Sequence, residues 1–211
     1  MNRHCVIIYG ETCAGKSTVG KHLGGALGCP YISFGDLKRE AIAAGTETGL
    51  AIQRLLDEGL PIRAELGYAV IEDAMRDTLN VISGYPISAT EFETLSIHAP
   101  VVGVITLSVD EQTLVRRFGL RRECPRCHMP GSVGDQCLVH GIPMIQREDG
   151  SAEQLIVRRQ LYQRRIGPFL ESRQIVDLPH LRIDTSKLTK LEVANLAEHW
   201  LRSLIAAGGA S

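Results

Sequence analysis

The chain lacks the features that are typical of membrane proteins, secreted proteins and proteins that bind polyanions. Its formal net charge is only −1 at pH 7, so no overall field attracts it to nucleic acid or to an anionic membrane. No apolar run approaches the roughly 18 residues of a membrane-spanning helix, and residues 1–10 lack the apolar stretch of a signal peptide. Repeats and low-complexity linkers are also lacking. We therefore expect one cytoplasmic domain over residues 1–211, with no nucleic-acid and no membrane partner.

Short runs rich in Val and Ile alternate with longer segments of helical periodicity, as in a parallel sheet covered by helices on both faces. The expected strands are residues 5–9, 31–32, 79–82, 101–107 and 181–183. The expected helices are residues 16–27, 35–44, 50–56, 64–78, 110–118, 152–170 and 188–205. Asp110 and Ser151 are suited to cap two of these helices at their N-termini. The pattern predicts an α/β fold with a five-stranded parallel sheet wrapped by helices.

Residues 10–17 read Gly-Glu-Thr-Cys-Ala-Gly-Lys-Ser and match G-x-x-x-x-G-K-[ST] between the first expected strand and helix. The glycines let the backbone form a nest of N–H donors around phosphate, and the helix N-terminus adds its positive dipole end. Lys16 is expected to bridge the β- and γ-phosphates of ATP, and the Ser17 hydroxyl to bind Mg²⁺. The predicted donor-binding residues of this loop are Gly10, Cys13, Ala14, Gly15, Lys16, Ser17 and Thr18. The motif predicts a P-loop NTPase-type three-layer fold, but alone it does not separate kinases from ATPases, GTPases or switches.

The six cysteines fall into two groups. Cys5, Cys13 and Cys29 are scattered through or near apolar segments, and we expect ordinary buried thiols there. The other three lie close together with histidines nearby, which requires a separate explanation.

Residues 121–147 show neither helical nor strand periodicity, and so long a loop in a compact domain needs something that organises it. The loop has the spacing Cys-x2-Cys-x9-Cys-x2-His, which is typical of a closed, tetrahedral, structural Zn²⁺ site. The predicted zinc ligands are Cys124, Cys127, Cys137 and His140. His128 could compete with His140. Zinc ribbons also bind nucleic acid, but this loop has no aromatic side chain for base stacking, which favours a metal-bearing lid over the phosphate-binding loop.

Seven segments follow one another in the order typical of adenylate kinases, and the chain resembles that family along nearly its whole length. These segments are the P-loop, residues 32–39, 44–49, 57–62 and 83–86, the arginines at 117, 121 and 122, and residues 147–149 with Arg158 and Tyr162. The resemblance implies transfer of a phosphoryl group from ATP, with Mg²⁺, to a nucleoside monophosphate. It also implies acceptor-binding helices at 33–66, a zinc lid at 121–147, and a core formed by residues 1–32, 67–120 and 148–211.

The resemblance further implies roles for single residues. Arg121, Arg147 and Arg158 would neutralise the transferred group, because guanidinium is permanently charged and binds phosphate through a planar fork. Arg117 would flank the donor base, and Arg39 would hold the phosphate of the acceptor. The implied catalytic set is Lys16, Asp36, Arg121, Arg147 and Arg158. The implied substrate-binding set is Phe34, Gly35, Arg39, Ile62, Gly84, Tyr85 and Glu91.

Four positions near the acceptor site and the metal depart from the family pattern. Ser83 stands where the family has an aspartate, and Ile87 where it has an arginine that grips the acceptor phosphate. Glu91 replaces a glutamine that reads adenine, and Phe34 replaces a threonine. Losing one charge-assisted phosphate contact costs about 1.5–3 kcal/mol. We therefore predict an acceptor other than AMP: another nucleotide, a nucleotide-like intermediate or a smaller phosphorylated compound, with Glu91 a candidate partner for an amino group on it.

Two other functions stay open. A kinase of small-molecule hydroxyl groups would use Asp36 as its carboxylate, although it would not need Arg39. A nucleotide-binding protein without catalysis would explain Ser83 and Ile87 together, although it would not need the arginines along the transfer path. The sequence favours a monomer without excluding an oligomer.

Overall fold

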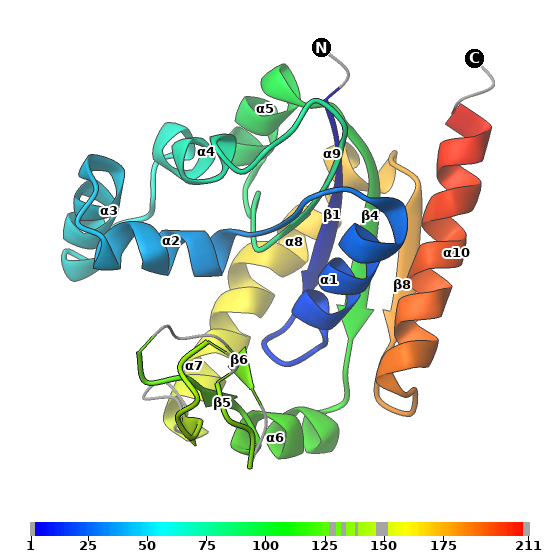
Figure 1. The fold of residues 1–211 in the computed structure, drawn as a ribbon. Coiled ribbons are helices and arrows are strands. Elements are labelled where there is room, and N and C mark those ends of the chain that lie inside the picture. The colour runs from blue at the N-terminus through cyan, green and yellow to red at the C-terminus, as the bar shows by residue number, and fades with distance from the viewer. Residues whose placement is uncertain (1–2, 127–129, 132–133, 138, 147–151, 209–211) are drawn as a thin grey trace.

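The computed structural model describes residues 3–126, 130–131, 134–137, 139–146 and 152–208. Five parallel strands form its central sheet in the order β2-β3-β1-β4-β8 (Figure 1). They are β1 (His4–Gly10), β2 (Tyr31–Ser33), β3 (Leu79–Ser83), β4 (Val101–Ser108) and β8 (His180–Asp184). The predicted five-stranded parallel sheet is confirmed. Because all five strands are parallel, their carboxyl ends share one edge, and β1 delivers the P-loop to the middle of that edge.

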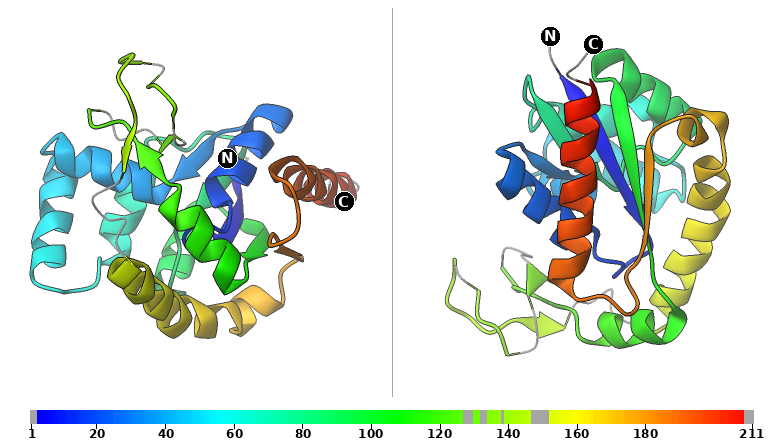
Figure 2. Two further views of the ribbon diagram at one scale, coloured as in Figure 1. Left: turned by 90° about the horizontal axis from the view of Figure 1, so that it is seen from below. Right: turned by 90° about the vertical axis from the view of Figure 1, so that its right-hand side faces the viewer.

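Helices cover both faces of the sheet. They are α1 (Lys16–Leu27), α2 (Phe34–Ala43), α3 (Glu47–Asp57), α4 (Ala64–Glu72), α5 (Ala89–His98), α6 (Glu111–Gly119), α7 (Ala152–Leu161), the π-helical turn η1 (Tyr162–Ile166), α8 (Gly167–Leu170), α9 (Arg173–Val176) and α10 (Lys190–Gly208). Helices α1 and α10 pack on one face through Leu23 and Leu201. Helices α4, α5 and α8 pack on the other face, around Tyr9 and Phe169. The right-hand view of Figure 2 shows α10 along the sheet, with the continuous α7–η1–α8 helix on the opposite side.

The helix predictions failed at three places, one of them the short α9, which was not predicted. The helix expected over residues 64–78 ends at Glu72, because the wholly buried Asn80 side chain replaces the helical hydrogen bonds. Asn80 Nδ2 donates to the carbonyls of Arg76 and Thr78, and its Oδ1 accepts from the Arg76 N–H at 3.0 Å. Helix α5 was not predicted, although the Ser-x-x-Glu pattern that begins at Ser88 is a sequence signal for a helix N-terminus. The predicted cap Asp110 is confirmed, since its carboxylate accepts from the Thr113 N–H at 2.8 Å, while Ser151 lies outside the described residues.

The segment 121–147 contains a small antiparallel sheet, ordered β6-β5-β7, at the carboxyl edge of the central sheet (Figure 1). Its strands are β5 (Arg122–Glu123), β6 (Pro130–Gly131) and β7 (Ile145–Gln146). No strand was predicted in this segment. Strands of two residues are too short to show an alternating pattern. None of the described helices is long and apolar enough to cross a membrane.

Candidate active site

The P-loop connects β1 to α1 and holds the Lys16 ammonium inside its turn. Gly10 has φ +153°, and a Cβ there would lie 2.7 Å from the Leu107 carbonyl oxygen of β4, so only glycine fits. Lys16 Nζ donates to the carbonyl oxygens of Gly10 at 2.7 Å and Glu11 at 2.9 Å. Burial lowers the pKa of Lys16 to about 8. The first turn of α1 carries no acidic residue and no side-chain cap, so its N–H groups and Lys16 together suit an anion.

Two arginines from different elements lie near Lys16. Arg121 follows α6, and Arg158 lies on α7. Both guanidinium groups lower the pKa of Lys16 by charge repulsion, and Arg121 hydrogen-bonds the Cys13 side chain. The structure thus brings together three of the five residues of the predicted catalytic set. Arg147 lies outside the described residues.

Arg117 connects the P-loop to the segment that follows the edge strand β8. Its guanidinium donates to the Thr185 carbonyl at 2.7 Å, to Thr185 Oγ1 at 2.9 Å and to the Cys13 carbonyl at 3.5 Å. Thr185 follows β8 and also donates its hydroxyl hydrogen to the Ser108 carbonyl at 3.0 Å. No local pattern pointed to Thr185, because its contacts depend on two strands that are distant in the chain.

Glu11 of the P-loop forms an ion pair with Arg159 of α7. Arg159 Nε lies 3.5 Å from Glu11 Oε2, and Arg159 Nη1 lies 2.9 Å from Glu111 Oε2. Burial raises the pKa of Glu11, while the charges of Arg159 and Lys16 oppose that rise. Glu11 and Arg159 were not among the site residues predicted from the sequence.

The predicted acceptor-binding residues gather where α2 meets the loop after β3. Phe34 begins α2, and its ring centroid lies 5.4 Å from that of Tyr85. A Cβ added to Gly84 would lie 3.8 Å from Phe34 Cβ. Asp36 and Arg39 form an ion pair on the same helix.

The other predicted residues of this region take more peripheral places. A Cβ on Gly35 would lie 3.6 Å from Arg39 Nη1, so Gly35 adjoins the same ion pair. Ile62 packs, partly buried, against the core beneath these residues. Lys38 was not among the predicted site residues. Its Nζ lies 5.8 Å from the Phe34 ring centroid.

The positions that depart from the family pattern have partners within the chain. Glu91 Oε2 accepts from the Ile87 N–H at 2.6 Å, and burial raises the pKa of this carboxyl. Ser83 Oγ lies 2.8 Å from the Tyr31 hydroxyl. The nearby Tyr9 hydroxyl is buried without a hydrogen-bond partner among the described residues. Its burial and the charges of Glu91 and Tyr162 raise the pKa of Tyr9 well above the usual range.

Three of the predicted zinc ligands cluster in the small sheet. Their donor atoms all lie within 4.8 Å of one another, and the sulfurs of Cys124 and Cys137 each lie 3.5 Å from His140 Nδ1. A tetrahedral zinc ion would set sulfur and nitrogen roughly 3.6 Å apart, so the donor set fits zinc. The Arg126 N–H donates to Cys124 Sγ at 3.4 Å, as suits a thiolate. Cys127 and His128 lie outside the described residues.

Cys5, Cys13 and Cys29 form no disulfide. Cys5 and Cys29 are buried, as predicted. Cys13 is only partly buried, because it lies in the P-loop rather than in a strand.

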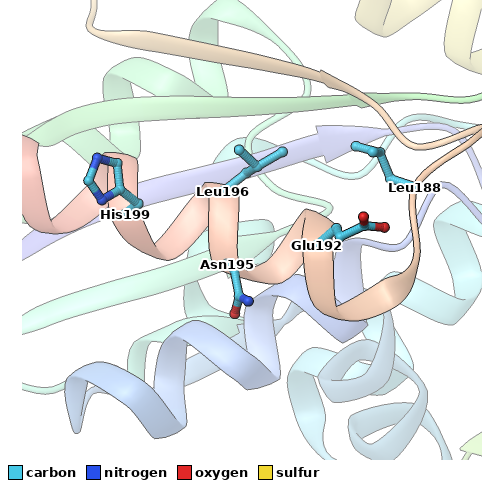
Figure 3. Close-up of a pocket in the computed structure, with 5 residues that line it drawn as sticks. All are labelled: Leu188, Glu192, Asn195, Leu196 and His199. Atoms are coloured by element: carbon cyan, nitrogen blue, oxygen red, sulfur yellow. The ribbon is translucent and has the colours of Figure 1, made fainter.

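A separate pocket of about 420 Å³ lies on α10 (Figure 3). It is lined by Leu188, Glu192, Asn195, Leu196 and His199. Glu192 Oε2 is already engaged, since it accepts from the Thr189 N–H and hydroxyl, both at 2.8 Å. Its lining includes none of the residues of the P-loop site, so this pocket is separate from that site.

Comparisons with known proteins give a consistent result. No model of a protein family matches the chain. The chain is 30% identical over 184 residues to an adenylate kinase of Kosmotoga olearia, with 78% of this chain and 84% of the relative covered. It is 32% identical over 183 residues to an adenylate kinase of Pseudothermotoga lettingae and 31% identical over 182 residues to one of Fervidobacterium nodosum, in both cases with 79% of this chain and 84% of the relative covered.

Proposed function

The chain belongs to the adenylate kinase family, and from this membership we propose that it transfers the γ-phosphoryl group of ATP to a nucleoside monophosphate or a nucleotide-like acceptor. The observation that carries the proposal is the gathering of Lys16, Arg121 and Arg158 beside the P-loop. Phosphoryl transfer spreads negative charge over three oxygens, and converging cations lower its barrier. A protein that only binds nucleotide has no physical need for them.

In the proposed reaction the chain positions two nucleotides and neutralises charge. An ionised phosphate oxygen of the acceptor attacks the γ-phosphorus of ATP, the bond from that phosphorus to the β–γ bridging oxygen breaks, and ADP leaves. No general base is required, because the attacking oxygen carries no proton. Mg²⁺ that arrives with ATP would be held by the Ser17 hydroxyl and would offset charge on the phosphates. Arg117 is proposed to flank the donor base.

Two segments are proposed to move around this core. Residues 33–66, with α2 and α3, would bind the acceptor. Residues 121–147 would form a lid that excludes water when it closes. A zinc ion held by Cys124, Cys127, Cys137 and His140 would keep the lid folded, and the fit of the described donor atoms supports it.

The acceptor is proposed to differ from AMP. Ile87 offers no charge to an acceptor phosphate, and Ser83 is engaged with Tyr31. Phe34 fills its position with a ring packed on Tyr85. These contacts support a remodelled acceptor pocket beside a donor site of ordinary composition.

A transfer assay with Mg·ATP tests the proposal. Wild-type protein is incubated with a panel of nucleoside monophosphates and simple alcohols, and the products are identified by mass. We expect a nucleoside diphosphate from at least one monophosphate, and no product from Lys16→Met. Binding of ATP without any product would contradict the proposed transfer, and phosphorylation of alcohols alone would favour the hydroxyl kinase. AMP as the best acceptor by far would contradict the altered specificity.

A further inference from the structure

Lys38 lies on α2 and is half-buried. Among the residues that the structure describes, no carboxylate forms an ion pair with it, and Asp36 of the same helix pairs with Arg39 instead. Burial, followed by the charges of Arg39 and Arg158, lowers the pKa of Lys38. Among the described residues, the charged groups that shift the pKa of Lys38 are both positive.

Such an arrangement is unfavourable unless an anion occupies it. A partly desolvated ammonium loses hydration, and neighbouring guanidinium groups add repulsion. Arg39 lies one residue along α2, whereas Arg158 comes from α7, more than a hundred residues later in the chain. Cations from two separate elements thus act on Lys38, and a phosphate dianion bound beside it would offset their repulsion.

The position of Lys38 relates it to Ile87. Its ammonium lies over the Phe34 ring, at 5.8 Å from the centroid, and that ring packs against Tyr85. Tyr85 precedes Ile87 by two residues, and Gly84 adjoins Phe34 Cβ. The Phe34 ring therefore lies near both Lys38 and the loop in which the family has its phosphate-binding arginine and this chain has Ile87.

We propose that Lys38 supplies the cationic contact that is lost at Ile87, so that Lys38, Arg39 and Arg158 bind the phosphate of the acceptor. The inference rests on the proposed phosphotransferase function and deepens it, because it assigns the acceptor a phosphate dianion. A lysine acts as a flexible point charge, whereas an arginine is a rigid bidentate fork. The acceptor phosphate can thus take a different orientation from that of AMP in the family.

Steady-state kinetics with the best acceptor of the panel test the role of Lys38. We expect Lys38→Met to lower kcat/KM for the acceptor by about 10- to 150-fold, with the KM for ATP unchanged. Lys38→Arg should retain most of the activity, because it keeps the charge. The matched control is Lys190→Met, which removes an exposed lysine on α10 and should behave like the wild type. An unchanged kcat/KM for the acceptor in Lys38→Met would overturn the proposal.

A double variant asks whether Lys38 replaces the missing arginine. Adding Ile87→Arg to Lys38→Met should recover at least part of the lost kcat/KM for the acceptor, because a positive charge returns at the position where the family has its arginine. No recovery would show that Lys38 does not stand in for that position. Since methionine has nearly the length of lysine and removes a partly buried charge, the variant should melt no lower than the wild type.

A binding experiment separates failure of this inference from failure of the proposed function. With a non-hydrolysable Mg·ATP analogue in the donor site, the binding of inorganic phosphate is followed by ³¹P NMR. Wild type and Lys190→Met should bind phosphate, whereas Lys38→Met should bind it at least about tenfold more weakly. The phosphate-binding result does not depend on catalysis. If no acceptor of the panel is phosphorylated, only the proposed transfer is contradicted. Equal phosphate binding by all three proteins would refute the role of Lys38.

Discussion

Replacing Glu91 by leucine tests what holds the loop before α5. Glu91 is only 7% exposed, and its Oε2 accepts from the Ile87 N–H at 2.6 Å. Leucine cannot accept this bond, so a partly buried N–H loses its partner, at a cost of about 1–2 kcal/mol. In a protein of this size each kcal/mol changes the Tm by about 2–4 °C. We therefore expect Glu91→Leu to melt about 2–8 °C below the wild type.

Glu91→Gln is the matched variant, because its amide oxygen can still accept from the Ile87 N–H. Burial raises the pKa of the Glu91 carboxyl, against the opposing effects of this hydrogen bond and of Arg165. The folded state therefore binds the proton more tightly than the unfolded chain does. The stabilising contribution of this proton is full at low pH and decreases as the pH rises through the raised pKa. Glutamine does not titrate, so Glu91→Gln should gain stability relative to the wild type across that window.

Urea denaturation between about pH 4 and pH 8 measures the free energy of unfolding of all three proteins. If Glu91→Gln lost as much stability as Glu91→Leu at neutral pH, the argument from burial would be refuted, and the charge interaction with Arg165 would dominate. The KM for the acceptor in the same variants examines the second predicted role of Glu91. A changed KM for Glu91→Gln at an unchanged Tm would support contact between this side chain and the acceptor.

Three further predictions concern the P-loop, the donor site and the lid. Gly10→Ala should lower the free energy of unfolding by at least about 1–3 kcal/mol, because the backbone conformation is strained for alanine and the Cβ would lie 2.7 Å from the Leu107 carbonyl. Denaturation of Gly25→Ala, whose Cβ would meet nothing within 4 Å, is the control and should show no loss. Arg117→Met should raise the KM for ATP by about two- to thirtyfold with the acceptor KM unchanged, and equal changes in both would contradict a donor-side role. Cys137→Ser should lower the bound zinc well below about one ion per chain and lower the Tm while ATP binding persists, whereas a variant with full metal and the parent's Tm would show that the ligand set is wrong.

Local features of the fold could be predicted from the sequence. Strands β1 and β4 are largely apolar runs, and the P-loop lies between a strand and a helix that are adjacent in the chain. The cap at Asp110 depends only on Thr113, three residues later. Helix α5 has a comparable local signal at Ser88 that was overlooked. Features of this kind involve neighbouring residues and follow from backbone geometry and hydrogen bonding within one segment.

Other features depended on contacts that no local pattern shows. Asn80 ends α4 because burial brings its amide to the carbonyls of Arg76 and Thr78, where periodicity alone would continue the helix. The strands of the lid are too short to produce a pattern. Tyr9 occupies an ordinary strand position, yet its hydroxyl is buried beside Glu91.

The sequence by itself determined the phosphate-binding loop, the parallel sheet and the spacing of the metal ligands, because each is encoded by residues close together in the chain. Only the tertiary structure decided which charges meet. Lys38 reads in the sequence as one more solvated lysine, and Glu91 as a residue open to a ligand. Among the described residues Lys38 pairs with no carboxylate, and Glu91 is only 7% exposed although its bond to the Ile87 N–H spans just four residues. The burial of both side chains follows from the packing of α2 and α5 in the folded chain. Burial and charge pairing depend on the whole fold, and these two properties define the proposed acceptor site.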